Sequence, residues 1–196
     1  MLTAAYTGLR AGELAALKVK RLNLLRREVE VVEQATEVAG ELVWGPPKSG
    51  ETRTVRIPRF LADELGAYLV DRPHGPEALV FTAPDGGPLR QSSFVRGYIR
   101  PAVRAAGLPE GLRFHDFRHT AASLMIASGA NVKAVQRQLG HASAAMTLDV
   151  YAGLFPEDLD AVADRLDELH QRAAASDGAD VGQAGTVQGI AAAQRP

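Results

Sequence analysis

The spacing of apolar residues changes along the chain, and this change limits the folds that the sequence can adopt. Apolar and polar residues alternate in segments 28–34, 41–44 and 53–57, as is typical of half-buried strands. From residue 91 onward the apolar residues instead recur at helical intervals. We therefore predict an α+β fold that is mainly helical and carries a small three-stranded antiparallel sheet. In this sheet 41–44 and 53–57 flank the turn Lys48-Ser49-Gly50-Glu51, which places Lys48 near the tip of a hairpin.

The helical segments begin and end at recognisable signals. Residues 1–17 read as a helix that is interrupted at Thr7-Gly8-Leu9-Arg10, so Arg10 is expected at a helix start. Asn131 is a typical N-cap and Gly140 a typical end of the helix that follows it. Further helices are expected over 61–69, from 91 with a kink at Pro101, over 115–128, 143–151 and 159–169, and a short strand is expected over 79–81.

The composition is that of one globular domain. The chain has 196 residues, 46% of them hydrophobic, and no cysteine, which excludes a disulfide scaffold, a thiol nucleophile and a thiolate metal site. No apolar run approaches the roughly 18 residues of a membrane span, and we expect a cytoplasmic protein without membrane contact. Residues 1–172 are expected to form the domain, and residues 173–196, with 8 Ala and 4 Gly, a disordered tail.

The charges are distributed unevenly. Residues 89–141 carry 8 basic and 2 acidic side chains, although the net charge of the chain is only −1. Such a cluster favours a surface that meets a polyanion, or it is a solvated face. The candidate DNA-phosphate contacts are Arg96, Arg100, Arg104 and Arg137.

Three segments combine residue types that suit phosphate chemistry. They are Thr7-Gly8-Leu9-Arg10-Ala11-Gly12-Glu13-Leu14, His115-Asp116-Phe117-Arg118-His119-Thr120, and Leu139-Gly140-His141 with Tyr151 ten residues later. With Lys48 in Pro46-Pro47-Lys48-Ser49-Gly50, they stand in the order found in the tyrosine recombinases, the phage integrase family, which the chain resembles over residues 2–169.

The resemblance implies a site-specific recombinase that cuts and rejoins DNA through a covalent 3′-phosphotyrosine, without metal, ATP or another cofactor. The implied partners are double-stranded DNA attachment sites and further copies of the chain, as a tetramer on paired sites and a monomer in isolation. Family members also carry an N-terminal helical domain that clamps the DNA. Since this chain starts nine residues before Arg10, we expect a catalytic domain without that clamp.

Metal-free cleavage of a phosphodiester explains why these residues occur together. It needs cations on the non-bridging oxygens, and Arg10 and Arg118, both near helix N-termini, suit this task. Tyr151 is the expected nucleophile. His115, one turn before Arg118, is expected to act as general base or proton shuttle.

The remaining site residues have supporting roles. The resemblance implies that Lys48 is the general acid for the 5′ leaving oxygen and that His141 donates a hydrogen bond to the phosphate. Glu13 is expected to orient Arg10 or a histidine. His119 is expected to pack or form a hydrogen bond within the fold rather than to react.

Two other functions fit parts of the sequence. A helix-turn-helix regulator could use residues 131–140 and 143–151, with Arg137 facing a groove, but it leaves Arg10, Lys48 and His115 unused. A metal hydrolase could use His115, His119 and His141 as ligands, although Asp116 replaces the glutamate of the HExxH motif. Both explain fewer of the residues.

Overall fold

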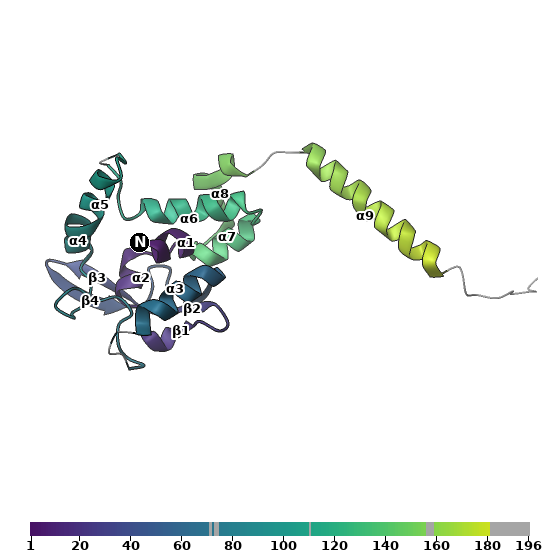
Figure 1. Ribbon diagram of the computed structural model, residues 1–196. Coiled ribbons are helices and arrows are strands. Elements are labelled where there is room, and N and C mark those ends of the chain that lie inside the picture. Colours follow the sequence, from purple (N-terminus) through teal and green to yellow (C-terminus); the bar gives the residue numbers. More distant parts are fainter. Residues whose placement is uncertain (71, 73–74, 110, 156–158, 181–196) are drawn as a thin grey trace, which may run out of the picture. The chain divides into compact units, whose positions relative to one another are not determined.

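The protein divides into two compact units in the computed structural model of Figure 1, residues 1–155 and residues 156–196. The structure describes all residues except 71, 73–74, 110, 156–158 and 181–196. The described part of the second unit is helix α9 (Leu159–Asp180). Every other described element belongs to the first unit, which holds all the candidate site residues.

Short helices are the predominant secondary structure of the first unit. They are α1 (Leu2–Thr7), α2 (Ala11–Ala15), α3 (Arg59–Val70), α4 (Gln91–Phe94), α5 (Arg100–Ala105), α6 (Asp116–Ala127), α7 (Val132–Leu139) and α8 (Ala144–Tyr151), with 3₁₀ turns at Val19–Arg21 and Ala152–Leu154. The expected caps are present: Asn131 accepts a hydrogen bond from the Ala134 N–H, and Gly140 ends α7 with a φ of 68°.

The strands form two separate antiparallel sheets. β1 (Leu22–Asn23), β2 (Glu28–Val31) and β5 (Arg53–Arg56) make a three-stranded sheet in the order β1-β2-β5. β3 (Gln34–Val38) and β4 (Glu41–Gly45) form a hairpin of their own, with Ala35 opposite Trp44. The predicted fold class is confirmed, but the expected pairing of 41–44 with 53–57 is wrong, because residues 34–38 provide β4 with a nearer partner.

One further expectation needs correction. Residues 79–81 do not form a strand; Leu79 makes one isolated bridge with Lys18. Near Pro101, where a kink was expected, α4 and α5 are joined by a π-helical turn, Val95–Ile99, that ends two residues before the proline. Since proline lacks an N–H and its ring clashes with the preceding turn, the widened turn allows the helix to continue.

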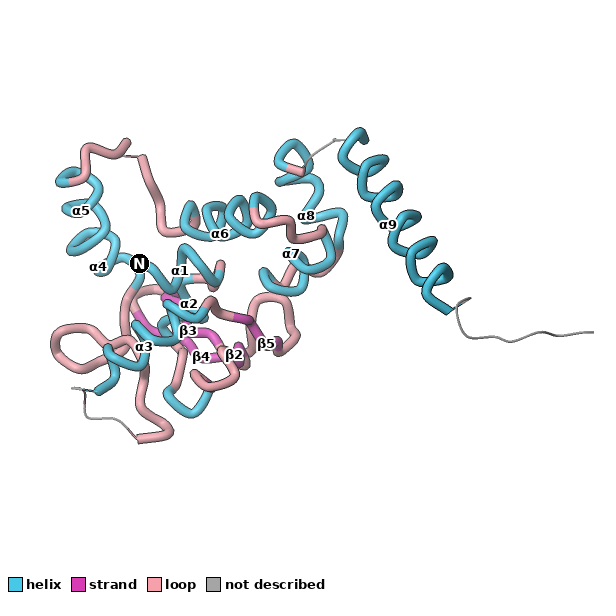
Figure 2. Tube along the Cα trace, turned by 45° about the vertical axis from the view of Figure 1, so that its right-hand side comes forward, coloured by secondary structure: helices cyan, strands magenta, loops and turns pink. Residues whose placement is uncertain are grey.

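Packing in the core holds α1 against α6 and α2 against the β3–β4 hairpin. α1 packs against α6, α2 against β3, and α7 against both β5 and α8. Figures 1 and 2 both show α6 running along α1. At Gly8, a Cβ would lie 2.3 Å from a methyl carbon of Leu139, so this glycine allows the loop before Arg10 to approach α7.

The helix of the C-terminal unit extends beyond the boundary expected at residue 172. α9 continues to Asp180, so residues 173–180 are helical rather than disordered, and residues 181–196 lie outside the described residues. Alanine is the strongest helix former, and an alanine-rich segment that cannot form a core can still form a helix. In the described part of the chain, no helix has the length and hydropathy needed to cross a membrane.

Candidate active site

A buried carboxylate organises the arginines of the site. Glu13, 2% exposed, accepts a hydrogen bond from the Arg10 backbone N–H at 2.9 Å and from the Arg10 guanidinium at 3.1 Å. Arg53 on β5 binds the same carboxylate through both terminal nitrogens, at 2.9 and 2.8 Å. Burial disfavours the charged carboxylate, but the hydrogen bonds and charges of the two arginines outweigh it and lower the pKa of Glu13.

Arg53 also connects the three-stranded sheet to the end of α7. Its Nε donates to the Gln138 carbonyl at 3.3 Å. A Cβ on Gly140 would lie 2.8 Å from the Arg53 side chain, so the close contact requires glycine at this position. Arg53 was not among the expected site residues, because an arginine on an alternating strand resembles a solvent-facing residue.

Arg118 is a buried cation whose hydrogen bonds go to backbone carbonyls. It is 3% exposed and donates to the Gly8 oxygen at 2.6 Å and the Leu139 oxygen at 2.7 Å. These bonds join the loop before Arg10 to the turn before His141. Burial, followed by repulsion from Arg10, lowers the pKa of Arg118 to about 10, which leaves it charged at neutral pH.

His141 lies next to these cations. Its Nδ1 is 2.9 Å from the Oγ1 of Thr147, a fully buried residue of α8. Burial and the positive charges of Arg118, Arg10 and Arg53 lower its pKa to about 4, so the imidazole is neutral at pH 7. His141 is therefore suited to donate a neutral hydrogen bond.

Tyr151, the last residue of α8, is buried. It is 5% exposed and packs with Ala122, Ile126, Val135 and Leu139. Its ring lies nearly parallel to that of His141, with centroids 6.4 Å apart. Burial raises the pKa of Tyr151 above 10, and the nearby charge of Arg118 opposes the rise. Its hydroxyl lies 2.9 Å from the Nδ1 of His119.

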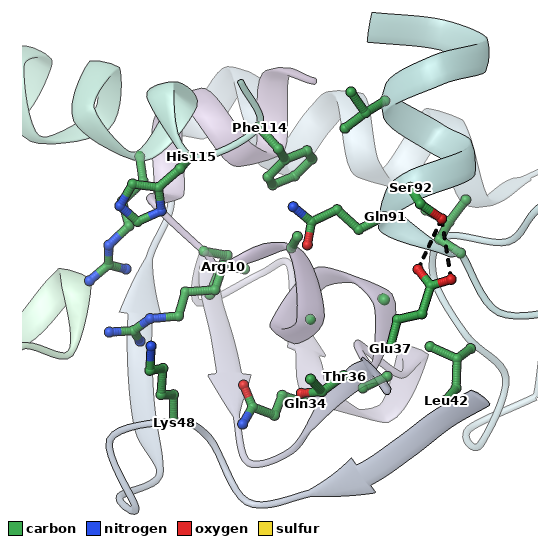
Figure 3. A pocket seen from close by; sticks show the side chains of 18 of the residues that line it. Arg10, Gln34, Thr36, Glu37, Leu42, Lys48, Gln91, Ser92, Phe114 and His115 are labelled. Carbon is green, nitrogen blue, oxygen red and sulfur yellow. Dashed lines mark hydrogen bonds between the residues drawn. The ribbon is translucent and has the colours of Figure 1, made fainter. Parts of the chain in front are cut away.

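A cleft of about 820 Å³ is lined by Arg10, Lys48, His115 and Arg118, but not by His141 or Tyr151. Figure 3 shows the side chains of Arg10, Lys48 and His115 at this cleft. Lys48 is exposed, in a turn closed by a hydrogen bond from the Gly50 N–H to the Pro47 oxygen. Because β4 and β5 belong to different sheets, this turn is a connection between sheets and not the expected hairpin tip.

The candidate DNA contacts divide into two groups. Arg96 and Arg100 line the same cleft as Arg10 and Lys48. Arg104 is exposed and shares a smaller hollow with Arg100, and Arg137 is exposed on α7. Thus the fold places two of the four arginines at the same opening as the site.

His115 is exposed and its ring packs edge to face on that of His119, with centroids 5.0 Å apart. Burial, followed by the positive charges of His119 and Arg118, lowers its pKa. Among the described residues, His115, His119 and His141 are not arranged as a group that could hold a metal ion. Instead, His119 contacts Tyr151, and His141 lies near Arg118, Arg10 and Arg53.

The chain is similar to known proteins over most of its length. A model of the phage integrase family matches residues 1–157. The ICEBs1 integrase of Bacillus subtilis (strain 168) is 33% identical over 177 residues, which cover 85% of this chain and 47% of that protein. The tyrosine recombinase XerC of Nitrobacter winogradskyi is 31% identical over 123 residues, covering 62% of this chain and 38% of that protein.

The fold is also found among solved structures. A Tn1549 transposon integrase in complex with a circular intermediate DNA superposes with a TM-score of 0.70 at 21% identity, over 85% of this chain and 56% of that one. This likeness supports the α+β fold. The chain spans less than half the length of the two relatives named above.

Proposed function

The chain belongs to the phage integrase family, and from this we propose that it is the catalytic part of a site-specific DNA recombinase that cuts and rejoins strands through a phosphotyrosine. We place the catalytic domain at residues 1–172. The proposed reaction needs no metal, ATP or cofactor, because side chains of the chain supply the cations, the acid and the nucleophile.

One observation carries the proposal: the site contains more guanidinium groups than carboxylates. Arg10 and Arg53 both bind the carboxylate of Glu13, whereas Arg118 has backbone carbonyls as its hydrogen-bond partners. Arg118 stays charged although burial, followed by repulsion from Arg10, lowers its pKa, so the three positive charges exceed the one negative charge of Glu13 and further negative charge would be stabilised there. A DNA phosphate in the cleft would supply that charge.

In this reaction Arg10 and Arg118 hold the non-bridging oxygens of the scissile phosphate and stabilise the charge that grows on them. His141 adds a third donor. If the Thr147 hydroxyl donates to its Nδ1, the proton of the neutral imidazole lies on Nε2, which is then free to donate to the phosphate.

Bond exchange involves Tyr151 and Lys48. The tyrosine oxygen forms a bond to phosphorus as the bond from phosphorus to the 5′ oxygen breaks, and Lys48 gives a proton to that leaving oxygen. His115 lies at the cleft beside Arg118 and can move protons to or from the phosphate. The phosphotyrosine conserves the bond energy, so the 5′ hydroxyl of another strand can later reverse the step.

The proposed partner is double-stranded DNA, with the chain acting as a tetramer on paired sites in the bacterial cytoplasm. The basic side chains of Arg96 and Arg100 at the cleft support a path for the DNA backbone. A solved relative in complex with circular intermediate DNA supports the same partner. The helix-turn-helix regulator is not favoured, since it leaves the buried arginine cluster without a task.

Because the target sequence is unknown, the test uses a library of nicked duplexes with a randomised centre. A nick beside the cleavage point lets the short leaving strand diffuse away, so a covalent protein–DNA adduct accumulates. We expect an adduct that survives denaturation and forms equally well in EDTA. Tyr151→Phe should retain DNA binding and form no adduct; an undiminished adduct in that variant, or complete loss on chelation, would contradict the proposal.

A further inference from the structure

The hydroxyl of Tyr151 is hydrogen-bonded to a histidine to which the proposed mechanism gives no task. His119 follows Arg118 on α6, and its Nδ1 lies 2.9 Å from the Tyr151 oxygen. The two rings meet at an angle of 63° with centroids 5.7 Å apart. This is hydrogen-bond distance for a proton acceptor next to a hydroxyl.

The surroundings of the phenol make an acceptor necessary. Tyr151 is 5% exposed and packs among apolar side chains of α6 and α7. Burial raises the pKa of its hydroxyl, and the charge of Arg118 offsets only part of the rise. A neutral phenol is a weak nucleophile, so its proton must pass to a nearby base as the bond to phosphorus forms.

The other candidate bases are already engaged or lie elsewhere. His115 is exposed at the cleft and contacts His119 through its ring, and within the described part of the chain it makes no hydrogen bond to the phenol. The Nδ1 of His141 is bonded to Thr147. The Glu13 carboxylate is held by two arginines.

We propose that His119 is the general base that takes the proton of Tyr151, an inference that rests on the proposed recombinase function. In the forward step the Tyr151 oxygen bonds to phosphorus, the bond from phosphorus to the 5′ oxygen breaks, and the phenol proton moves to His119 Nδ1. The leaving oxygen receives its proton from Lys48.

Rejoining reverses each transfer. The incoming 5′ hydroxyl gives its proton to Lys48 and bonds to phosphorus, the phosphotyrosine bond breaks, and the tyrosine oxygen recovers its proton from the His119 imidazolium. In this arrangement His115 moves protons at the phosphate, and His119 takes the proton of the nucleophile. His115 at the N-cap of α6 and His119 in its first turn thus have different tasks.

The test compares His119→Asn with the parent chain on nicked duplexes selected from the library. The asparagine oxygen occupies nearly the position of Nδ1 and can accept the tyrosine hydrogen bond, but it cannot take up the proton. We expect adduct formation in a single turnover to slow by about 10²- to 10⁴-fold, the usual contribution of a positioned base. DNA binding and thermal unfolding should stay close to those of the parent.

A more acidic phenol distinguishes a base from a positioning group. Difluorotyrosine, introduced at position 151 by codon suppression, loses its proton more readily, so the defect of His119→Asn should shrink towards the parent rate. His115→Asn on the same helix face is the matched comparison, and its defect should not shrink. A second measurement is the rescue of His119→Ala by imidazole in solution.

The outcomes separate the two levels of the argument. The assignment of His119 is overturned if His119→Asn forms the adduct as fast as the parent. It is also overturned if the acidic phenol leaves the defect unchanged and imidazole does not rescue His119→Ala. In both cases the Tyr151 adduct itself still stands. A parent chain that forms no Tyr151 adduct overturns the proposed function itself.

Discussion

Glu13 is the residue on which the charge balance of the site depends. It is fully buried at its side chain and binds Arg10 and Arg53, so its loss leaves cations without a counter-charge. We expect Glu13→Gln to lower the free energy of unfolding by about 3 kcal/mol in urea titrations. Glu30→Gln, which breaks the exposed pair with Arg21, should change it by less than about 1 kcal/mol; equal effects would contradict the account.

The same carboxylate predicts a pH dependence. The folded-state pKa of Glu13 is lowered from 4.5, so its contribution to stability is fully present above that value and is lost as the pH falls through the lower folded-state pKa. We expect the stability difference between the parent and Glu13→Gln to be constant near neutral pH and to shrink below pH 4.5. Urea unfolding at several pH values measures it, and a difference that grows on acidification would contradict the prediction.

Lys48 has a role that a modified substrate can isolate. If it protonates the 5′ leaving oxygen, Lys48→Ala should slow cleavage of ordinary DNA by roughly 10²- to 10⁴-fold. A substrate with sulfur at the 5′ bridging position needs no proton, so the variant should cleave it almost as fast as the parent does, whereas Arg118→Ala should stay impaired. Equal impairment of Lys48→Ala on both substrates would mean that the lysine only positions DNA.

The sequence indicated the candidate catalytic residues better than it indicated their hydrogen-bond partners. The order of Arg10, Lys48, His115, Arg118, His141 and Tyr151 was readable, and the fold brings them to one region. Arg53 and His119 were not assigned to the site. Their contacts join residues 40 and 32 positions apart, and such long-range pairs leave no periodic pattern in a single sequence.

The short helix α2 depends on a glycine that lets the hairpin approach. A Cβ on Gly12 would lie 2.6 Å from the Ala35 backbone oxygen, and backbone cannot move aside easily. We expect Gly12→Ala to destabilise the fold by about 1–3 kcal/mol and to weaken DNA cleavage. Gly66→Ala in α3, where the nearest atom lies 3.7 Å away, should instead be neutral or stabilising by up to about 1 kcal/mol. Thermal unfolding of both variants compares them.

Among the elements, helices with capping residues were predictable and strand partners were not. Asn131 and Gly140 mark the ends of α7 through local hydrogen bonds, which the sequence shows directly. Most of β3 lies outside the three alternating segments at 28–34, 41–44 and 53–57, so the strand that pairs with β4 was not expected at all. The π-helical turn before Pro101 likewise depends on how the helix adjusts to a missing N–H.

For the molecule as a whole, the distribution of charge predicts how it binds DNA. Each phosphate contact releases counterions, so the affinity should fall steeply with salt. Arg100→Gln at the cleft should weaken binding to all sequences alike and reduce the slope of log K against log salt by about 0.9. Arg21→Gln, outside the cleft, is the matched control. An unchanged slope for Arg100→Gln would show that Arg100 does not contact a DNA phosphate.

The chemical identity of the protein–DNA bond tests the central claim most directly. The adduct from the nicked-duplex library can be digested with protease and nuclease, and the modified peptide sequenced by mass spectrometry. The account predicts a nucleotide joined through its 3′ phosphate to the oxygen of Tyr151, with a free 5′ hydroxyl on the released strand. A bond to any other residue, a 5′-phosphate linkage, or cleavage without a covalent intermediate would contradict it.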